Sequence, residues 1–164
     1  MRLIIIAKVI MVCGKICSGK STYAEKLRMK DNAVLLSVDE IMLTVFGQNA
    51  GEKHDEYVGK IKKYLLKRIP EFINAGISVI LDWGFWTRQD RDFTRKFCQI
   101  HNIKCEVHYI DISDEVWKQR ISNRNNMVSA GKSESYFVDD GLVEKFISMF
   151  EAPDKNEVDI LINI

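Results

Sequence analysis

The sequence has few of the residues that interrupt or cross-link a chain. Its 164 residues include two prolines and four cysteines, and it contains no repeat or low-complexity tract. The cysteines form no Cys-x-x-Cys pair and no histidine cluster accompanies them, which argues against a zinc site. This pattern is typical of reduced, mostly buried cysteines, and we therefore expect a cytoplasmic protein.

A surplus of charge and a long hydrophobic run are also missing. The formal net charge is +1, which gives no sign of a broad surface for nucleic acid or an anionic membrane. The apolar run LIIIAKVIMVC is interrupted by Lys8 and is too short to span a bilayer. Because it has no small-residue cleavage site, we interpret it as a core strand rather than a signal peptide. With 46% apolar residues and no shift in composition, a single domain over 1–164 is expected.

Apolar runs alternate along the chain with helical patterns. The run at 77–83 is continuous and rich in β-branched residues, as a buried parallel strand is. The alternation predicts an α/β sandwich with a mainly parallel sheet. We expect strands at 8–13, 33–39, 77–83, 104–112 and 158–164, and helices at 21–30, 55–76, 87–102, 113–126 and 140–150.

The segment GKICSGKS lies between the first expected strand and helix, and it matches G-x-x-x-x-G-K-[ST] in full. Glycines let the backbone turn tightly and aim successive N–H groups at a phosphate, and the following helix adds its positive dipole end. The lysine can reach the β- and γ-phosphates and the hydroxyl can hold Mg²⁺. The segment therefore predicts binding of a nucleoside triphosphate with Mg²⁺, with the Lys15 side chain facing solvent. The expected nucleotide-binding residues are Gly14, Lys15, Ile16, Cys17, Ser18, Gly19, Lys20, Ser21 and Thr22.

Two aspartates end the other strands that should reach the same edge of the sheet. Asp82 ends an apolar run, which is the pattern of a carboxylate that serves Mg²⁺ together with Ser21. An ordinary strand-end turn or helix cap is the alternative. Asp39 follows the second strand and is free to accept a proton from an attacking hydroxyl, with Mg²⁺ binding or capping as the alternatives.

Basic and aromatic residues supply the remaining candidates. Arg120 and Arg124 are spaced i, i+4 and share one helix face. Cations at this spacing suit a lid over the moving phosphoryl group, whereas a solvated helix face is the alternative. The expected substrate contacts also include Trp83, Trp86, Arg88 and Arg91, although packing under a loop would explain the aromatic residues equally well.

Together these segments resemble the small P-loop kinases of the group that contains chloramphenicol phosphotransferase, zeta toxin and the polynucleotide 5′-kinases. The shared elements are GKICSGKS, SVDEIM, VILDWGFWTRQDRD and WKQRISNRN, and they span nearly the whole chain. The resemblance implies a P-loop NTPase three-layer sandwich with sheet order 2-3-1-4-5 and a small lid. It also implies Mg-ATP as donor, a hydroxyl acceptor, Asp39 as base, Arg120 and Arg124 in the lid, and an adenine contact near Pro153 and Asp154.

One position departs from part of that group. Zeta toxins and polynucleotide kinases often have an arginine three residues after the catalytic aspartate, where this chain has Met42. We therefore predict phosphotransfer to a small molecule, such as an antibiotic or another metabolite, that carries no phosphate. A polynucleotide or nucleotide-sugar kinase is the first alternative. An ATP-binding regulatory module without phosphotransfer is the second.

Overall fold

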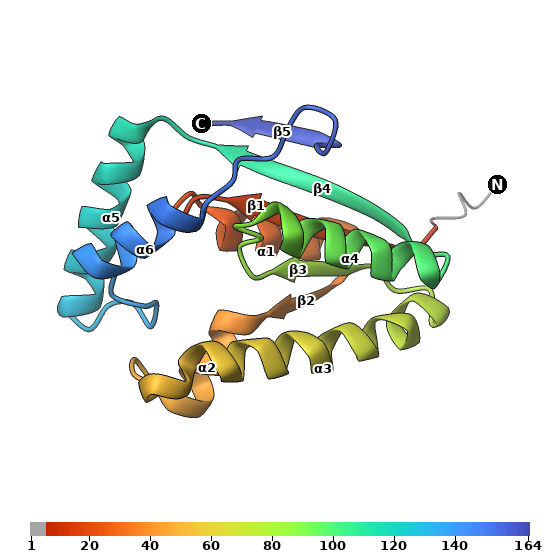
Figure 1. The fold of residues 1–164 in the computed structure, drawn as a ribbon, viewed down its shortest axis with the longest axis horizontal. Helices are drawn as coiled ribbons and strands as arrows, with labels where there is room; N and C mark the ends of the chain where they lie inside the picture. Colours follow the sequence, from red (N-terminus) through yellow and green to blue (C-terminus); the bar gives the residue numbers. More distant parts are fainter. Residues whose placement is uncertain (1–5) are drawn as a thin grey trace.

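The computed structural model describes residues 6–164 and contains a five-stranded sheet with helices on both faces (Figure 1). The strand order is β2-β3-β1-β4-β5, and every neighbouring pair is parallel. The expected P-loop sandwich and its strand order are thus confirmed. The strands are β1 (Lys8–Gly14), β2 (Val34–Ser37), β3 (Val79–Asp82), β4 (Lys104–Asp111) and β5 (Ile160–Asn163).

The helices follow the predicted alternation with one addition, α2. Strand β2, which precedes α2, ends at Ser37, earlier than expected. The Ser37 hydroxyl accepts a hydrogen bond from the Glu40 backbone N–H at 3.3 Å and so caps the start of the helix. Ser and Glu at this spacing form a capping-box pattern. The helices are α1 (Lys20–Asp31), α2 (Val38–Phe46), α3 (His54–Asn74), α4 (Arg88–Ile100), α5 (Asp114–Ser129) and α6 (Asp140–Met149), with a 3₁₀ turn η1 (Gly51–Lys53).

Alternating side chains of the central strand β1 build the two cores. Val9, Met11 and Cys13 pack on the face covered by α2, α3 and α4. Ile10 and Val12 pack on the opposite face, with residues of α1, α5 and α6. All five side chains are fully buried, as expected for the middle strand of a parallel sheet covered on both sides. The carboxyl end of β1 is therefore held rigidly at the edge of the sheet.

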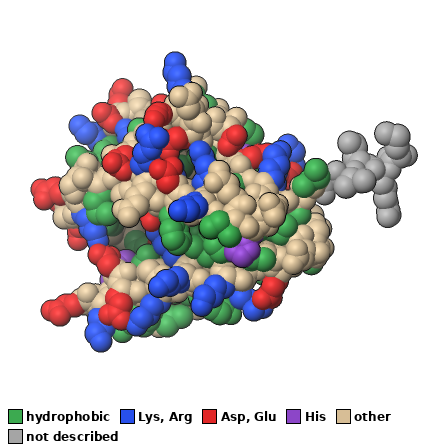
Figure 2. All heavy atoms as spheres, turned by 45° about the vertical axis from the view of Figure 1, so that its right-hand side comes forward, with side chains coloured by type: hydrophobic (Ala, Val, Ile, Leu, Met, Phe, Trp, Pro, Cys, Tyr) green, Lys and Arg blue, Asp and Glu red, His purple; other side chains and the backbone are tan. Residues whose placement is uncertain are grey.

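The outer surface matches the near-neutral composition. Figure 2 shows acidic and basic side chains intermixed over the face that it displays. None of the helices in residues 6–164 has the length and apolar character needed to cross a bilayer. The predicted core strand is present from Lys8 onward, whereas the part of the apolar run at 1–5 lies outside the described residues.

Candidate active site

The phosphate loop joins β1 to α1 and requires glycine at two points. Gly14 has φ of +157°, and a Cβ there would lie 2.8 Å from both the Ile110 carbonyl oxygen and Ser18 Oγ. Gly19 precedes α1 with φ of +96°, in the left-handed region that favours glycine. The loop thus follows β4 closely and then opens directly into the N-terminus of α1, the end at which a helix attracts anions.

Lys20 extends back over this loop. Its ammonium Nζ donates a hydrogen bond to the Lys15 carbonyl oxygen at 2.6 Å. Burial lowers the pKa of Lys20, and the negative charges of Asp82 and Asp39 oppose that change. The lysine charge therefore lies between the phosphate loop and two carboxylates, which is where a phosphate chain would have to be neutralised.

The two carboxylates come from neighbouring strands. Ser37 of β2 pairs with Asp82 of β3, and Asp39 follows two residues later in the first turn of α2. Both aspartates line cavities, and of the two Asp82 is the one whose side chain is almost fully buried, at 6% exposed. Burial, followed by the Asp82 charge, raises the pKa of Asp39, although Lys20 and Arg124 act in the opposite direction. Two nearby carboxylates with different surroundings are suited to different chemical tasks.

Two adjoining cavities meet at these residues. The smaller, about 140 Å³, is bounded mainly by the phosphate loop, and the larger, about 780 Å³, extends over α2. Four residues line both: Ser21, Asp39, Asp82 and Arg124. A donor in the first cavity and an acceptor in the second would therefore meet between Asp39, Asp82 and Arg124.

The shared wall also contains oxygen atoms suited to Mg²⁺. Ser21 and Asp82 offer a hydroxyl and a carboxylate at the junction of the cavities. Within residues 6–164, no cluster of three or more His, Cys, Asp or Glu side chains could hold a metal by itself. Mg²⁺ that arrives with phosphates needs only one or two protein ligands and keeps several waters. The residues present fit that kind of site.

The two arginines of α5 lie in different places. Arg124 lines both cavities. Arg120 instead donates from Nη1 to the Ser18 carbonyl oxygen at 2.6 Å, on the phosphate loop itself. The expected pair is thus divided, with Arg124 facing the cavities and Arg120 bound to the loop backbone.

Trp83 and Trp86 are the predicted substrate contacts that the structure brings to the phosphate loop. Both line the smaller cavity. Trp86 also packs edge-on against Phe146 with ring centroids 5.1 Å apart, and Trp83 packs against Phe85 at 5.4 Å. These tryptophans therefore combine core packing with a wall of the nucleotide-side cavity.

Arg91 does not contact this site, and that prediction was wrong. Its side chain is 1% exposed and pairs with Glu157 at 3.0 Å. Its Nη1 donates to the carbonyl oxygens of Phe85 and Glu151 at 3.1 and 2.8 Å. A buried guanidinium that uses its donors in this way holds α4 to two loops. Arg91 is a structural residue.

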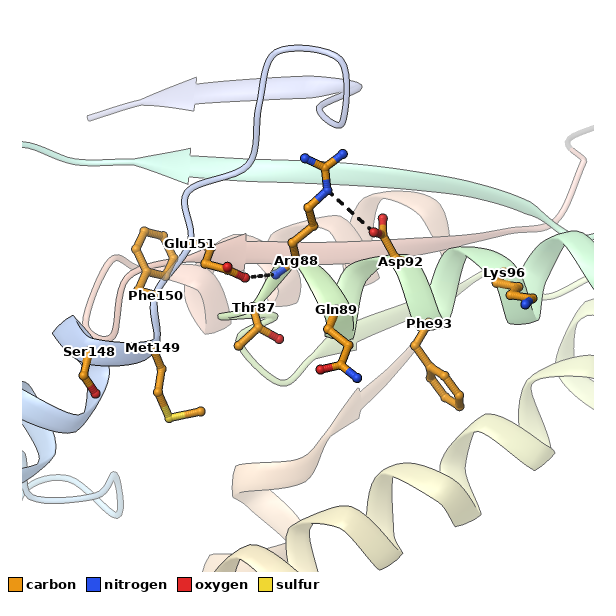
Figure 3. Close-up of a pocket in the computed structure, with 10 residues that line it drawn as sticks. All are labelled: Thr87, Arg88, Gln89, Asp92, Phe93, Lys96, Ser148, Met149, Phe150 and Glu151. Carbon is orange, nitrogen blue, oxygen red and sulfur yellow. Dashed lines mark hydrogen bonds and ion pairs between the residues drawn. The ribbon is translucent and has the colours of Figure 1, made fainter.

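Arg88 is also misplaced by the sequence prediction. Figure 3 shows it at the start of α4, in a separate pocket of about 730 Å³ formed with the segment that follows α6. Its guanidinium pairs with Asp154 at 3.0 Å and with Asp92 at 3.6 Å. Pro153 and Asp154, the expected adenine contacts, likewise line neither cavity at the phosphate loop.

Two further expectations are corrected. Met42 is fully buried in the core beneath α2, because the helix turns this side chain toward α3, so it presents no surface to an acceptor. Leu43 lines the larger cavity instead. Lys15 does not point freely into solvent, since its ammonium pairs with Asp114 at 2.6 Å and lies 5.1 Å from the Trp117 ring centroid.

Several residues of the larger cavity were not found from the sequence, because they match no local motif. They come from the α1 surface, from β2, from α2 and the turn after it, and from the loop between α5 and α6. They are Glu25, Leu35, Ser37, Leu43, Thr44, Gly47, Gln48, Glu134, Ser135 and Tyr136. They are joined by Glu40, which from the sequence was only a weaker candidate than Asp39.

The comparison with protein families agrees with this arrangement. Residues 9–153 match the family model described as an AAA domain, AAA_33. The chain belongs to this AAA domain family. The match spans the phosphate loop, both aspartates and α5, and it supports the resemblance to the P-loop kinase group drawn from the sequence. No curated protein sequence matches the chain significantly.

Solved structures of similar fold include several kinases. A sugar kinase from Janibacter sp. is 22% identical with a TM-score of 0.65, over 96% of this chain and 85% of that one. The APS kinase CysC of Mycobacterium tuberculosis, in complex with AMPPNP and APS, is 16% identical with a TM-score of 0.66, over 96% and 88%. A chain of the Pnkp1/Rnl/Hen1 RNA repair complex is 20% identical with a TM-score of 0.70, over 88% of this chain and 44% of that one. These likenesses establish the fold.

Proposed function

We propose that this protein is an ATP-dependent phosphotransferase that moves the γ-phosphate of Mg-ATP to a hydroxyl of a small molecule. The observation that carries the proposal is the position of Asp39, which lines both cavities together with Ser21, Asp82 and Arg124. A module that only binds ATP needs no carboxylate between the phosphate loop and a second cavity. The kinases among the structural neighbours support the same chemistry.

Each group in the site has a role in that reaction. Lys20 and the backbone N–H groups of the loop bind the phosphates, and Ser21 and Asp82 would hold the Mg²⁺ that neutralises them. Asp39 accepts the proton of the acceptor hydroxyl. The hydroxyl oxygen forms a bond to the γ-phosphorus while the bond from that phosphorus to the β–γ bridging oxygen breaks. ADP leaves with that bridging oxygen. Arg124 stabilises the charge on the transferring group.

The charge of the larger cavity indicates which acceptors fit. Its lining includes the side chains of five acidic residues, and Arg124 is its single basic residue. Bound Mg-ATP would engage Asp82 and Arg124, and Glu25 already pairs with Arg28. An acceptor phosphate would therefore face the carboxylates of Asp39, Glu40 and Glu134, which repel it. We therefore favour an uncharged or cationic hydroxyl compound over a sugar phosphate or a polynucleotide. This argument replaces the one based on Met42. The acidic residues are Glu25, Asp39, Glu40, Asp82 and Glu134.

A transfer assay sorted by acceptor charge tests the proposal. The protein is incubated with γ-labelled ATP, Mg²⁺ and one compound at a time: glucosamine or kanamycin, glucose, inositol or chloramphenicol, gluconate or glucose 6-phosphate, and a 5′-hydroxyl oligonucleotide. We expect label in a cationic or neutral compound and ~10²–10⁴-fold slower labelling with Asp39→Asn. Efficient labelling of the oligonucleotide would instead support the polynucleotide kinase alternative, for which the RNA repair neighbour is the supporting observation. Absence of transfer to every compound, with ATP still bound, would favour the regulatory module.

A further inference from the structure

Tyr136 has a polar group that the protein itself leaves unused. Its hydroxyl oxygen is buried, and within residues 6–164 it has no hydrogen-bond partner. The residue lines the larger cavity, as Asp39 does. Burial, followed by the Asp39 charge, raises the pKa of Tyr136, so the phenol stays protonated and remains a donor at neutral pH. An unpaired buried hydroxyl destabilises a fold, and this one belongs to a residue of the cavity wall, so we look for its partner among the ligands of the cavity.

The backbone on both sides of Tyr136 is held by one amide side chain. Gln48, in the turn after α2, donates from Nε2 to the Ser135 carbonyl oxygen at 2.9 Å. Its Oε1 accepts from the Phe137 N–H at 3.2 Å. These two bonds join the residues before and after Tyr136 to the acceptor side of the cavity. The side chain between them therefore has little freedom to turn away.

A second side-chain amide, on α5, binds the segment that contains Tyr136. Asn125 of α5 donates to the Val138 carbonyl oxygen at 2.7 Å, and its Oδ1 accepts from the Val138 N–H at 2.8 Å. The Tyr136 ring also packs edge-on against His54, with centroids 6.0 Å apart. The turn after α2, the start of α3 and α5 thus all contact the segment of Tyr136 or its ring, and none of these contacts involves the Tyr136 hydroxyl. In Figure 1 the loop between α5 and α6 extends toward α2.

We propose that Tyr136 binds the acceptor, with its hydroxyl donating a hydrogen bond to the acceptor beside Asp39, and that Gln48 is the residue that positions it. The inference rests on the proposed phosphotransfer and adds a specificity residue to the acceptor site. A phenol on a fixed segment gives a directional donor without a charge, which suits a neutral or cationic polyol.

The first test needs no acceptor. Tyr136→Phe removes only the hydroxyl, and Tyr64→Phe, on the exposed surface of α3, is the matched control. Because the Tyr136 hydroxyl bonds to no protein group, we expect the melting temperature of Tyr136→Phe to equal or exceed that of the wild type, as it does for the control. A decrease of more than about 2 °C would show that the hydroxyl stabilises the fold, and the inference would be overturned.

The second test uses the best-labelled compound of the charge-sorted series. We expect Tyr136→Phe to lower kcat/KM for that compound by about 10-fold or more, while the KM for ATP stays unchanged. Gln48→Ala should act in the same direction, and the double variant should lose little more than Tyr136→Phe alone, because both changes remove one interaction. Unchanged acceptor kinetics in Tyr136→Phe would refute the inference and leave the kinase proposal standing. If the wild type labels no compound, the proposed function fails, and the inference fails with it.

Discussion

At the residue scale, the proposed chemistry depends on two carboxylates, Asp39 and Asp82, whose surroundings the sequence alone does not show. Both follow apolar strands, and Ser37, which precedes α2, is paired with Asp82 in the sheet. Both line the two cavities, but Asp82 is 6% exposed at the end of β3, while Asp39 extends from the first turn of α2. These different positions are the basis on which we propose metal binding for Asp82 and proton acceptance for Asp39.

Asp39→Asn should separate nucleotide binding from transfer. The amide is nearly the same shape but cannot accept a proton, so we expect transfer to fall by ~10²–10⁴-fold while ATP still binds. Only the carboxylate form is active, so the wild-type rate should rise with pH as Asp39 loses its proton. Because the pKa of Asp39 is raised, this rise should lie above the pH of an ordinary aspartate. Rates measured across pH with the wild type and the variant test both points.

The outcome that contradicts this assignment is specific. If Asp39→Asn transfers phosphate at the wild-type rate, another group accepts the proton. Glu40→Gln is the appropriate control, because Glu40 is the next residue of the same helix turn and lines only the larger cavity. The control should keep the acid limb of the pH profile, which Asp39→Asn should abolish.

At the element scale, α5 presents two arginines to two different targets. Arg124 faces both cavities, whereas Arg120 bonds to the Ser18 carbonyl oxygen. The i, i+4 spacing correctly predicted that they share a face of the helix, but it could not reveal that the phosphate loop reaches only one of them. The structure therefore refines the idea of a lid with two equivalent arginines.

Alanine changes at these positions should affect different kinetic constants. Arg124→Ala should lower kcat by ~10²-fold or more with a smaller change in the KM for ATP, because its charge meets the phosphoryl group most strongly during transfer. Arg120→Ala loosens the loop that binds the phosphates, so we expect it mainly to raise the KM for ATP. Steady-state kinetics at varied ATP concentration measure kcat and the KM for ATP of both variants. Equal effects of both variants on kcat alone would restore the picture of a paired lid.

The elements also show where prediction from the sequence ends. The phosphate loop and Asp82 lie where the sequence placed them, because their signals are local, whereas Asp39 lies in the first turn of α2 rather than at the end of a strand. The helix α2 was missed, since its apolar residues continue the strand before it and only the Ser37 cap separates them. The contact between Gln48 and Ser135 spans 87 positions and has no local pattern, so Tyr136 could not be found in advance.

At the scale of the whole molecule, Arg91 shows how one buried ion pair holds the sheet edge together. It lies on α4 and binds Glu157, which precedes β5, and the carbonyl oxygens of Phe85 and Glu151. From the sequence it could not be distinguished from Arg88, three residues earlier on the same helix. The segment before β5 packs against α4, and this packing buries Arg91 and leaves Arg88 exposed.

Arg91→Met tests this structural role. The change keeps an unbranched apolar stem but leaves the Glu157 charge buried without its partner, so we expect the free energy of unfolding to fall by about 3–5 kcal/mol. Urea unfolding at neutral pH measures the loss. If Arg91 instead binds substrate, the variant would keep its stability and lose transfer. Arg95→Met, on the same helix with a single bond to the Glu157 carbonyl oxygen at 2.9 Å, should cost less.

The opposite end of the sheet from the site should determine how the molecule responds to acid. At the start of β4, Glu106 pairs with Lys8 at 2.7 Å and Lys104 at 2.9 Å. Burial opposes ionisation, but hydrogen bonds from Lys8, Lys104 and His108 lower the Glu106 pKa to about 2 from its ordinary 4.5.

A carboxyl whose pKa is lowered in the folded state stabilises the fold fully above its unfolded pKa, and that stability is lost as the pH falls toward the folded pKa. We therefore expect Glu106 to contribute on the order of 3 kcal/mol above pH 4.5 and to lose it between about pH 4.5 and 2. Glu106→Gln should be less stable at neutral pH, and its stability should fall less than that of the wild type over this interval. Glu56→Gln, which removes an exposed pair with Lys60, should follow the wild-type profile. Parallel profiles for wild type and Glu106→Gln would show that these lysines do not hold the carboxylate in solution.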